Sequence, residues 1–251
     1  MTLALDALTV RIAGKPVCTA LSLQIEAGSR WAVLGVNGAG KTTLLTTLAG
    51  LRAPAAGTVR LGDDAVAALP ARMRARRIAL MAQDDHDDAE STVLDIALLG
   101  RLPHLAWWQA ESARDEALAR EALAAMGLSG LEARRAASLS GGERRRLALA
   151  SLLVQDAPVW LLDEPTSHLD LHQQIALLER LRAQHARTLV MSLHDVNLAA
   201  RYCTHALLIF GGGDCCGGPV EAMLQPAVLG RLYGHDIRRV GEGADAVFVP
   251  V

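Results

Sequence analysis

The sequence predicts an α/β fold that combines a mainly parallel sheet, an antiparallel β subdomain and an inserted α-helical subdomain. Short apolar runs alternate with amphipathic helical segments, which is typical of parallel sheets. Polar–apolar alternation before residue 28 is typical of antiparallel strands, and residues 84–153 carry mainly helical periodicity. The chain of 251 residues is long enough to bury the core of one large domain.

Antiparallel strands are expected first, in an alternating stretch that Gly14 and Gly28 interrupt. Its apolar positions are Leu3, Leu5, Leu8, Val10, Ile12, Leu21, Leu23 and Ile25. The apolar run WAVLG at 31–35 is then typical of a buried strand. A glycine-rich loop follows, and after it a helix that ends near Gly50. We expect one face of this helix to carry Leu44, Leu45, Leu48 and Leu51.

Helices dominate the middle of the chain. Strands at 58–61 and 78–83 lead into an acidic, solvated loop, and helices are expected at 93–101, at 111–127 and from Ser140 onward. Strands resume at VWLLD, TLVMSL and ALLIF, with an intervening helix that presents Leu171, Ile175 and Leu178 on one face. The C-terminal part contains a short helix around PAVLGRLYG and a terminal AVFVPV.

Composition argues against several classes of protein. A formal net charge of -2 and 3% aromatic residues are unlike nucleic-acid-binding domains, which carry basic patches and stacking side chains. No run approaches the ~18 apolar residues of a transmembrane helix, and residues 1–12 lack the features of a signal peptide. Four cysteines show neither a metal-binding spacing nor a disulfide framework. We therefore expect a soluble protein that stays in a reducing cytoplasm.

The loop GVNGAGKT fits the phosphate-loop pattern, and it lies between a predicted strand and a predicted helix, as the pattern requires. Glycines allow backbone N–H groups to converge on phosphate oxygens, and the helix N-terminus favours an anion. The candidate nucleotide-binding residues are Gly35, Asn37, Gly38, Ala39, Gly40, Lys41, Thr42 and Thr43. Only Lys15 and Lys41 are lysines among 25 basic residues, and a guanidinium fork cannot replace the slim ammonium of Lys41 between phosphates. The sequence therefore predicts binding of a nucleoside triphosphate.

Two carboxylates end the apolar strand at 159–163. Asp163 can hold Mg²⁺ together with the hydroxyl of Thr42, and Glu164 can polarise the attacking water as a general base. Standing alone, this pair is better explained as a solvated strand end. Together with the phosphate loop it predicts triphosphate hydrolysis.

The segment Leu139-Ser140-Gly141-Gly142-Glu143 resembles the signature motif of the ABC-transporter ATPases. The resemblance covers nearly the whole chain, because the family's other motifs match in order: the phosphate loop, the Q-loop at Gln83, the strand before Glu164, the D-loop at Ser167 to Asp170 and the H-loop at His194. It implies a P-loop NTPase (RecA-like) core in residues 1–83 and 154–220, a helical subdomain in 84–153 and a short tail in 221–251, all in one ABC ATPase domain.

The resemblance assigns roles to further residues. It implies that Gln83 is a catalytic residue and a metal ligand, and that His194 is catalytic. Ser140, Gly141 and Gly142 would form a second anion site at a helix N-terminus, which closes on the triphosphate of a partner subunit. Two chains would then form a head-to-tail homodimer that uses ATP and Mg²⁺.

The stretch GRLPHLAWW, the run PTSHLDLHQQ, the segment HDVNLAARYC and the tail LGRLYGHDI together resemble the ATPases of iron-siderophore, haem or cobalamin importers. The resemblance implies a separate permease, a substrate-binding protein that acts through it, and a peripheral location on the cytoplasmic face of the inner membrane. Trp107 and Trp108 either dock the permease or pack the helical subdomain. An exporter ATPase and a nucleic-acid-associated ATPase remain alternatives, and the chain does not specify the cargo. The family's adenine-stacking aromatic has Ile12 as its nearest equivalent here.

Overall fold

The computed structural model describes residues 1–82, 90–167, 169–241 and 246–251. A six-stranded sheet forms its centre, in the order β10-β9-β3-β8-β7-β6, and all neighbours are parallel except β9 and β10. The strands are β3 (Arg30–Leu34), β6 (Ile78–Met81), β7 (Val159–Leu162), β8 (Thr188–Ser192), β9 (His205–Gly211) and β10 (Asp214–Pro219). The mainly parallel sheet is therefore confirmed.

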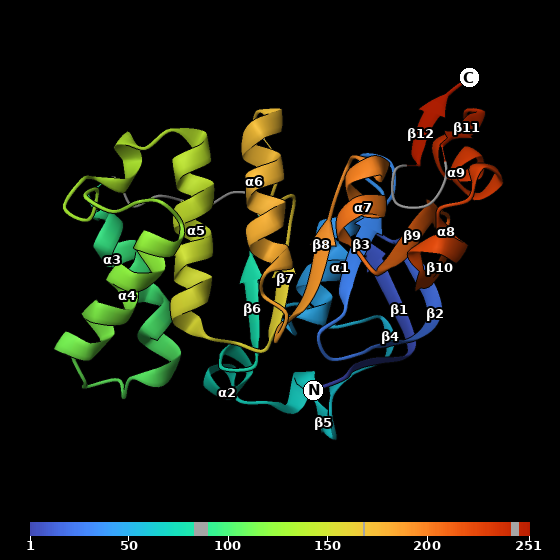
Figure 1. Ribbon diagram of the computed structural model, residues 1–251. Helices are drawn as coiled ribbons and strands as arrows, with labels where there is room; N and C mark the ends of the chain where they lie inside the picture. The colour runs from blue at the N-terminus through green and yellow to red at the C-terminus, as the bar shows by residue number, and fades with distance from the viewer. Residues whose placement is uncertain (83–89, 168, 242–245) are drawn as a thin grey trace.

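A four-stranded antiparallel sheet packs against one face of the central sheet, in the order β2-β1-β4-β5 (Figure 1). Its strands are β1 (Leu3–Ile12), β2 (Lys15–Ile25), β4 (Ala56–Leu61) and β5 (Asp64–Ala65). The helix α1 (Lys41–Leu48) lies between the two sheets, and one apolar core joins Leu44 and Leu45 to β1, β3 and β7. The predicted antiparallel subdomain is present.

The opposite face of the central sheet is covered by helices (Figure 1). Consecutive residues of β7 divide between the faces: Val159 and Leu161 join the core around α1, whereas Trp160 and Leu162 join a second core with the helices. Burial on both faces is expected of a central parallel strand. The helices that contribute to this second core are α3 (Val93–Leu98), α4 (Ala113–Ala125), α5 (Gly141–Gln155), α6 (Leu171–Arg182) and α7 (Val196–Tyr202).

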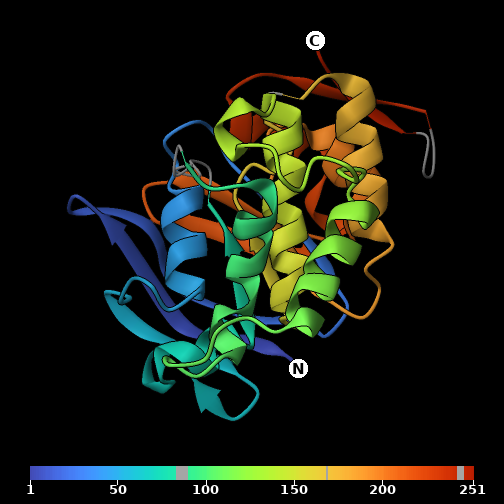
Figure 2. The ribbon, with the colours of Figure 1, turned by 90° about the vertical axis from the view of Figure 1, so that its left-hand side faces the viewer.

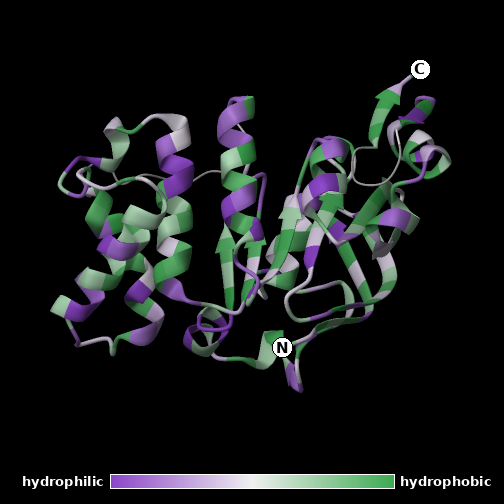
Figure 3. Cartoon of the chain, viewed as in Figure 1, coloured by the Kyte–Doolittle hydropathy of each residue, from purple (hydrophilic) through white to green (hydrophobic). Residues whose placement is uncertain are grey.

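The helices α3, α4 and α5 form a group at one side of the molecule, which Figure 2 shows face on. A 3₁₀ helix over Leu99–His104 completes this group and packs on α5. Figure 3 shows hydrophobic and hydrophilic residues interspersed along α5 and α6. No helix in the described ranges combines the length and apolar character needed to cross a bilayer.

The remaining elements are short. They are α2 (Ala71–Ala75), a 3₁₀ helix over Val66–Ala68, another over Ala136–Ser138, α8 (Val220–Met223), α9 (Pro226–Tyr233), β11 (Ile237–Val240) and β12 (Val247–Pro250). The strands β11 and β12 pair with each other, so the predicted terminal apolar run is a strand of a separate antiparallel ribbon.

Two predicted helix faces need correction. Leu51 is 64% exposed and lies beyond α1, because Gly50 adopts φ +70° and donates its N–H to Thr47, which ends the helix. Leu171 is 68% exposed because it is the first residue of α6, and the buried face of that helix is formed further on by Leu177, Leu178 and Leu181.

Candidate functional site

The glycine loop connects β3 to α1 and depends on glycine at residue 40 for two reasons. Gly40 has φ +97°, and a Cβ added there would lie 2.5 Å from a methyl carbon of Val17 in β2. A larger residue would thus clash with the antiparallel sheet and strain the backbone. Gly38 also has a positive φ, of +77°. These glycines let the loop pass close to β2 and line a cavity at the N-terminus of α1.

Lys41 is held in the centre of this loop. Its side chain is buried, with 6% of the residue exposed, and Nζ donates to the carbonyl oxygen of Gly35 at 2.9 Å and of Val36 at 3.4 Å. Burial lowers the pKa of Lys41, while the negative charges of Glu164 and Asp163 act in the opposite direction. These carboxylates thus favour the charged ammonium that an anionic ligand needs.

Asp163 and Glu164 lie at the carboxyl end of β7, next to the end of β8. The hydroxyl of Ser192 donates to Asp163 Oδ1 at 2.6 Å and accepts the backbone N–H of Glu164 at 2.7 Å. Glu164 has φ +48°, a conformation uncommon for a residue with a side chain. Ser192 therefore fixes both carboxylate residues at one point of the sheet edge.

Glu164 also pairs with His194. The distance from Oε1 of Glu164 to Nε2 of His194 is 2.7 Å. The Glu164 side chain is 15% exposed and that of His194 is 47% exposed. The two residues therefore present a carboxylate–imidazole pair at the solvent boundary, where the pair can accept a proton from water and hold it.

A cavity of about 410 Å³ brings the glycine loop, Lys41, Glu164 and His194 together, whereas Asp163 and Ser192 do not line it. It is lined by Ile12, Asn37, Gly38, Ala39, Gly40, Lys41, Thr42, Thr43, Glu164 and His194. Gly35 does not line the cavity. A Cβ at this position would lie 2.9 Å from the carbonyl oxygen of Ile209, so the start of the loop requires glycine. The cavity thus combines an anion-binding loop with a carboxylate that can act on water.

The signature segment lies elsewhere, because none of Ser140, Gly141 and Gly142 lines that cavity. Ser140 caps α5: its hydroxyl accepts the N–H of Glu143 at 3.3 Å, and Glu143 Oε2 accepts the N–H of Ser140 at 2.8 Å. These hydrogen bonds lower the pKa of Glu143. No heavy atom outside the local chain lies within 4 Å of a Cβ added at Gly141, so this glycine faces open space.

Sequence reasoning missed Ser192 and Arg145 as parts of this site. Arg145 is buried, and it donates to the hydroxyl of Ser167 at 2.8 Å and to the carbonyl of Ala82 at 3.2 Å, thereby linking α5 to the segment after Glu164. A polar residue at the end of the apolar run TLVMS was the available signal for Ser192. No local pattern distinguishes Arg145 from its two arginine neighbours.

Some predicted residues fall outside this description. Gln83 lies outside the described residues, and so does residue 168 within the predicted D-loop at Ser167 to Asp170. Trp107 and Trp108 are 91% and 73% exposed, so they do not pack the interior of the helical group.

Comparisons with known proteins place the chain in a family. Residues 18–167 match the family model described as ABC transporter. The chain is 39% identical over 248 residues to a cobalamin import ATP-binding protein of Halobacterium salinarum, covering 98% of this chain and 61% of that protein. It is 40% identical over 242 residues to a hemin import ATP-binding protein of Pseudomonas fluorescens, covering 94% and 93% of the two chains.

Solved structures show the same fold. A chain described as belonging to a metal-chelate type ABC transporter in an inward-facing conformation superposes with a TM-score of 0.87 and 27% identity, covering 100% of this chain and 97% of the other. A dimeric bacterial ABC transporter cassette superposes with a TM-score of 0.76 and 22% identity, covering 87% and 98%.

Proposed function

Because the chain belongs to the ABC transporter family, we propose that it binds and hydrolyses ATP as the energy-supplying subunit of an importer. One observation carries this proposal: a single cavity collects the glycine loop, Lys41, Glu164 and His194. The loop and the α1 N-terminus would bind the phosphates, with Lys41 reaching the terminal groups. Ile12 is 41% exposed in the same cavity and offers the base an apolar contact without stacking.

Thr42 and Asp163 fit a Mg²⁺ site. The Oδ2 atom of Asp163 is buried and has no hydrogen-bond partner among the described residues, as expected of an oxygen reserved for a cation or its water. Thr42 offers an exposed hydroxyl at the start of α1, and Gln83 is proposed as a third contributor. When bound, Mg²⁺ would neutralise charge on the phosphate oxygens.

Glu164 is the proposed general base. Its carboxylate accepts the proton of the attacking water, and His194, 2.7 Å away, holds that carboxylate in position. The hydroxyl of Ser192 forms hydrogen bonds to both residues and thereby holds Glu164 beside Asp163. This arrangement supports in-line attack on the terminal phosphate.

The site is proposed to be completed by a second copy of the chain. Ser140, Gly141 and Gly142 lie outside the cavity that they would have to serve within one chain. In a head-to-tail homodimer the signature of one subunit closes on the triphosphate bound by the other. The division into a nucleotide-binding core (1–83 and 154–220), a helical subdomain (84–153) and a tail (221–251) belongs to the same proposal.

The proposed cargo is a metal chelate such as an iron-siderophore, haem or cobalamin. The support is the likeness to importer proteins, including a ferric enterobactin transport ATP-binding protein of Escherichia coli that is 34% identical and covers 91% of this chain and 86% of that protein. The chain spans about 61% of the length of the cobalamin import relatives. A separate permease, a substrate-binding protein and a peripheral position on the cytoplasmic face of the inner membrane complete the proposal, without a nucleic-acid partner.

The Glu164→Gln variant tests the chemistry. Loss of the general base should reduce steady-state ATP turnover at least 100-fold, while ATP affinity stays within about threefold. The matched control is Glu121→Gln, which changes an exposed carboxylate on α4 and should keep wild-type turnover. An unchanged rate in Glu164→Gln would remove this residue from the mechanism.

The cargo is tested with the chain purified together with the permease encoded beside it, in vesicles. Haemin, cyanocobalamin and a ferric siderophore are each supplied with the partner binding protein, and ATP hydrolysis is measured. One chelate should stimulate turnover severalfold and accumulate inside the vesicles. Movement of a chelate out of the vesicles would show that the chain serves an exporter and not an importer.

A further inference from the structure

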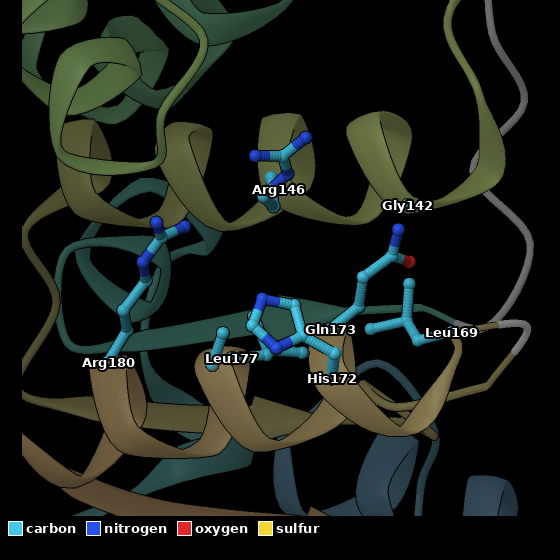
Figure 4. A pocket seen from close by; sticks show the side chains of 8 residues that line it. Gly142, Arg146, Leu169, His172, Gln173, Leu177 and Arg180 are labelled. Atoms are coloured by element: carbon cyan, nitrogen blue, oxygen red, sulfur yellow. The ribbon is translucent and has the colours of Figure 1, made fainter.

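A second cavity, of about 190 Å³, lies between α5 and α6 and shares no described residue with the cavity at the glycine loop, called the nucleotide cavity below (Figure 4). Its lining residues are Gly142, Arg146, Leu169, His172, Gln173, Ala176, Leu177 and Arg180. Figure 4 shows His172, Gln173 and Arg180 projecting from α6 towards α5. Among the described residues, the lining contains two arginines and a histidine and no carboxylate.

The two arginines lie side by side. Arg146 Nη1 donates to the carbonyl oxygen of Met126 at 3.4 Å, and Arg180 Nη1 donates to the same oxygen at 3.1 Å. Arg146 also contacts the carbonyl of Gly127, at 3.5 Å. These carbonyls end α4, so the helix dipole compensates only part of two positive charges.

No ion pair joins either arginine to a carboxylate within the described ranges. The acidic neighbours have other partners. Glu143, three residues before Arg146, is bound by Ser140. Glu179, next to Arg180, pairs with Arg182 at 2.8 Å. Glu143 still attracts Arg146 electrostatically. Nevertheless, two half-buried guanidinium groups lie next to each other, and none of the described residues that line the cavity is a carboxylate.

The donors that remain suit an anion with two oxygens. A guanidinium carries five N–H donors, and the hydrogen bonds described above use one nitrogen of each arginine. A carboxylate accepts such donors in pairs, and each charge-assisted bond is stronger than a bond to a neutral carbonyl. The head group of a carboxylate ligand therefore matches this part of the cavity.

The other lining residues indicate the size and polarity of the part of the ligand beyond its carboxylate. Leu169, Ala176 and Leu177 are apolar, whereas His172 and Gln173 supply polar groups. The volume is below the roughly 300 Å³ at which drug-sized sites begin, so the ligand has only a few carbon atoms. We propose that this cavity binds a small aliphatic carboxylate, with its head group on Arg146 and Arg180 and its carbon chain against Leu177.

Such a ligand would connect α5 to α6. Gly142 of the signature segment belongs to the lining, and a Cβ added there would lie 2.7 Å from Oε1 of Gln173. Occupancy would therefore restrain α5 next to the segment that is proposed to act on the partner subunit. Binding itself needs only one copy of the chain, so its test does not depend on ATP hydrolysis.

Succinate is the probe, and its binding to the full chain is measured by ligand-observed NMR and by the shift in Tm. We expect a dissociation constant in the millimolar range and a rise in Tm, because a ligand that binds only the folded state stabilises it. Arg180→Gln should weaken binding about tenfold, the loss of one charge-assisted contact. Arg182→Gln is the matched control, because this arginine lies on the same helix and pairs with Glu179 instead.

A second variant avoids the loss of the contacts that Arg180 makes to α4. Ala176→Glu keeps both arginines and places a carboxylate in the cavity, so it should abolish succinate binding without lowering the Tm of the ligand-free chain. Lys41→Ala shows which of the two cavities binds succinate. It removes the ammonium from the nucleotide cavity only, so it should leave succinate binding unchanged. Absence of binding at 50 mM succinate, loss of binding in Lys41→Ala, or equal binding of neutral succinamide would each overturn the proposal.

Discussion

The helices α1 and α5 both begin at glycine-containing segments, but their N-termini are satisfied differently. The N-cap of α1 is Gly40, which has no side chain to accept the first N–H groups, and the helix opens on the nucleotide cavity. The N-cap of α5 is Ser140, which forms a complete capping box with Glu143. The first N–H groups of an uncapped helix remain available to water or an anion, whereas a capping box satisfies two of these donors within the chain. The two ends thus fit the proposed roles, in which α1 binds the phosphates directly and α5 meets the triphosphate of another subunit.

Lys41→Arg should cause the largest loss of ATP hydrolysis among the variants, because it changes the uncapped N-terminus of α1. The side chain is almost fully buried between loop carbonyls, and a planar guanidinium is too broad for that space. ATP hydrolysis should fall below about 1% of wild type in a steady-state assay. Lys15→Arg is the control, since Lys15 is exposed at the start of β2, and it should be nearly silent. Near-normal turnover in Lys41→Arg would break the assignment of α1 as the ligand-dependent end.

Gly141→Glu tests the capped end. This residue has open space around it, so the variant should fold with an unchanged Tm and bind ATP as a monomer within about twofold of wild type. The added carboxylate should repel the partner's triphosphate. In a Glu164→Gln background, light scattering should therefore detect the ATP-dependent dimer with Gly141 and only monomer with Gly141→Glu. A persistent dimer would mean that α5 does not meet the nucleotide.

Ser192→Ala tests how the carboxylates of Asp163 and Glu164, which follow β7, are held near the N-terminus of α1. Removing the hydroxyl leaves Asp163 Oδ1 and the N–H of Glu164 without their shared partner. We expect turnover to fall about tenfold and unfolding free energy to fall by about 1–3 kcal/mol. Ser192→Thr retains a hydroxyl and should recover much of both quantities. Equal losses in the two variants would point to packing instead of hydrogen bonding.

Asp115→Asn should have the smallest effect, because it acts at the N-terminus of α4, which packs on α5 away from both glycine segments. Ser112 and Arg101 lower the pKa of Asp115 to about 2, through hydrogen bonds from Ser112 first and the ion pair with Arg101 second. A lowered carboxyl pKa contributes stability above the unfolded value near 3.9 and loses it as pH falls towards 2. Chemical denaturation at pH 7 should reveal a loss of about 1 kcal/mol.

The same Asp115→Asn comparison repeated at pH 2 should show little difference between variant and wild type. Glu116→Gln, which breaks an exposed pair with Arg120, is the control and should cost less than about 0.5 kcal/mol at pH 7. A loss that persists unchanged at low pH would show that charge does not contribute.

Features that depend on neighbouring residues in sequence were predictable. The phosphate loop is contiguous, and its residues were predicted together with Glu164 and His194, which the cavity brings beside them. The two sheets and the helical group followed from periodicity. Leu51 and Leu171 were misplaced because periodicity does not locate the residue at which a helix ends or begins.

Features that depend on contact between distant segments were not predictable. Ser192 reaches Asp163 only because β7 and β8 are parallel neighbours with their carboxyl ends aligned. Arg145 reaches Ser167 only because α5 packs beside the segment that follows β7. In both cases a common residue type gains its role from topology, which the linear pattern does not contain.

The scarcity of lysine makes the chain suitable for selective chemical labelling. Lys41 is buried, so an amine-reactive dye that modifies lysine side chains under native conditions should attach at Lys15. Lys15 pairs in register with Ile12, which lines the nucleotide cavity. With the label on Lys15 distinguished from any label on the α-amino group of Met1 by peptide mapping, the fluorophore would report nucleotide arrival at the end of the cavity that Ile12 lines, without an engineered cysteine.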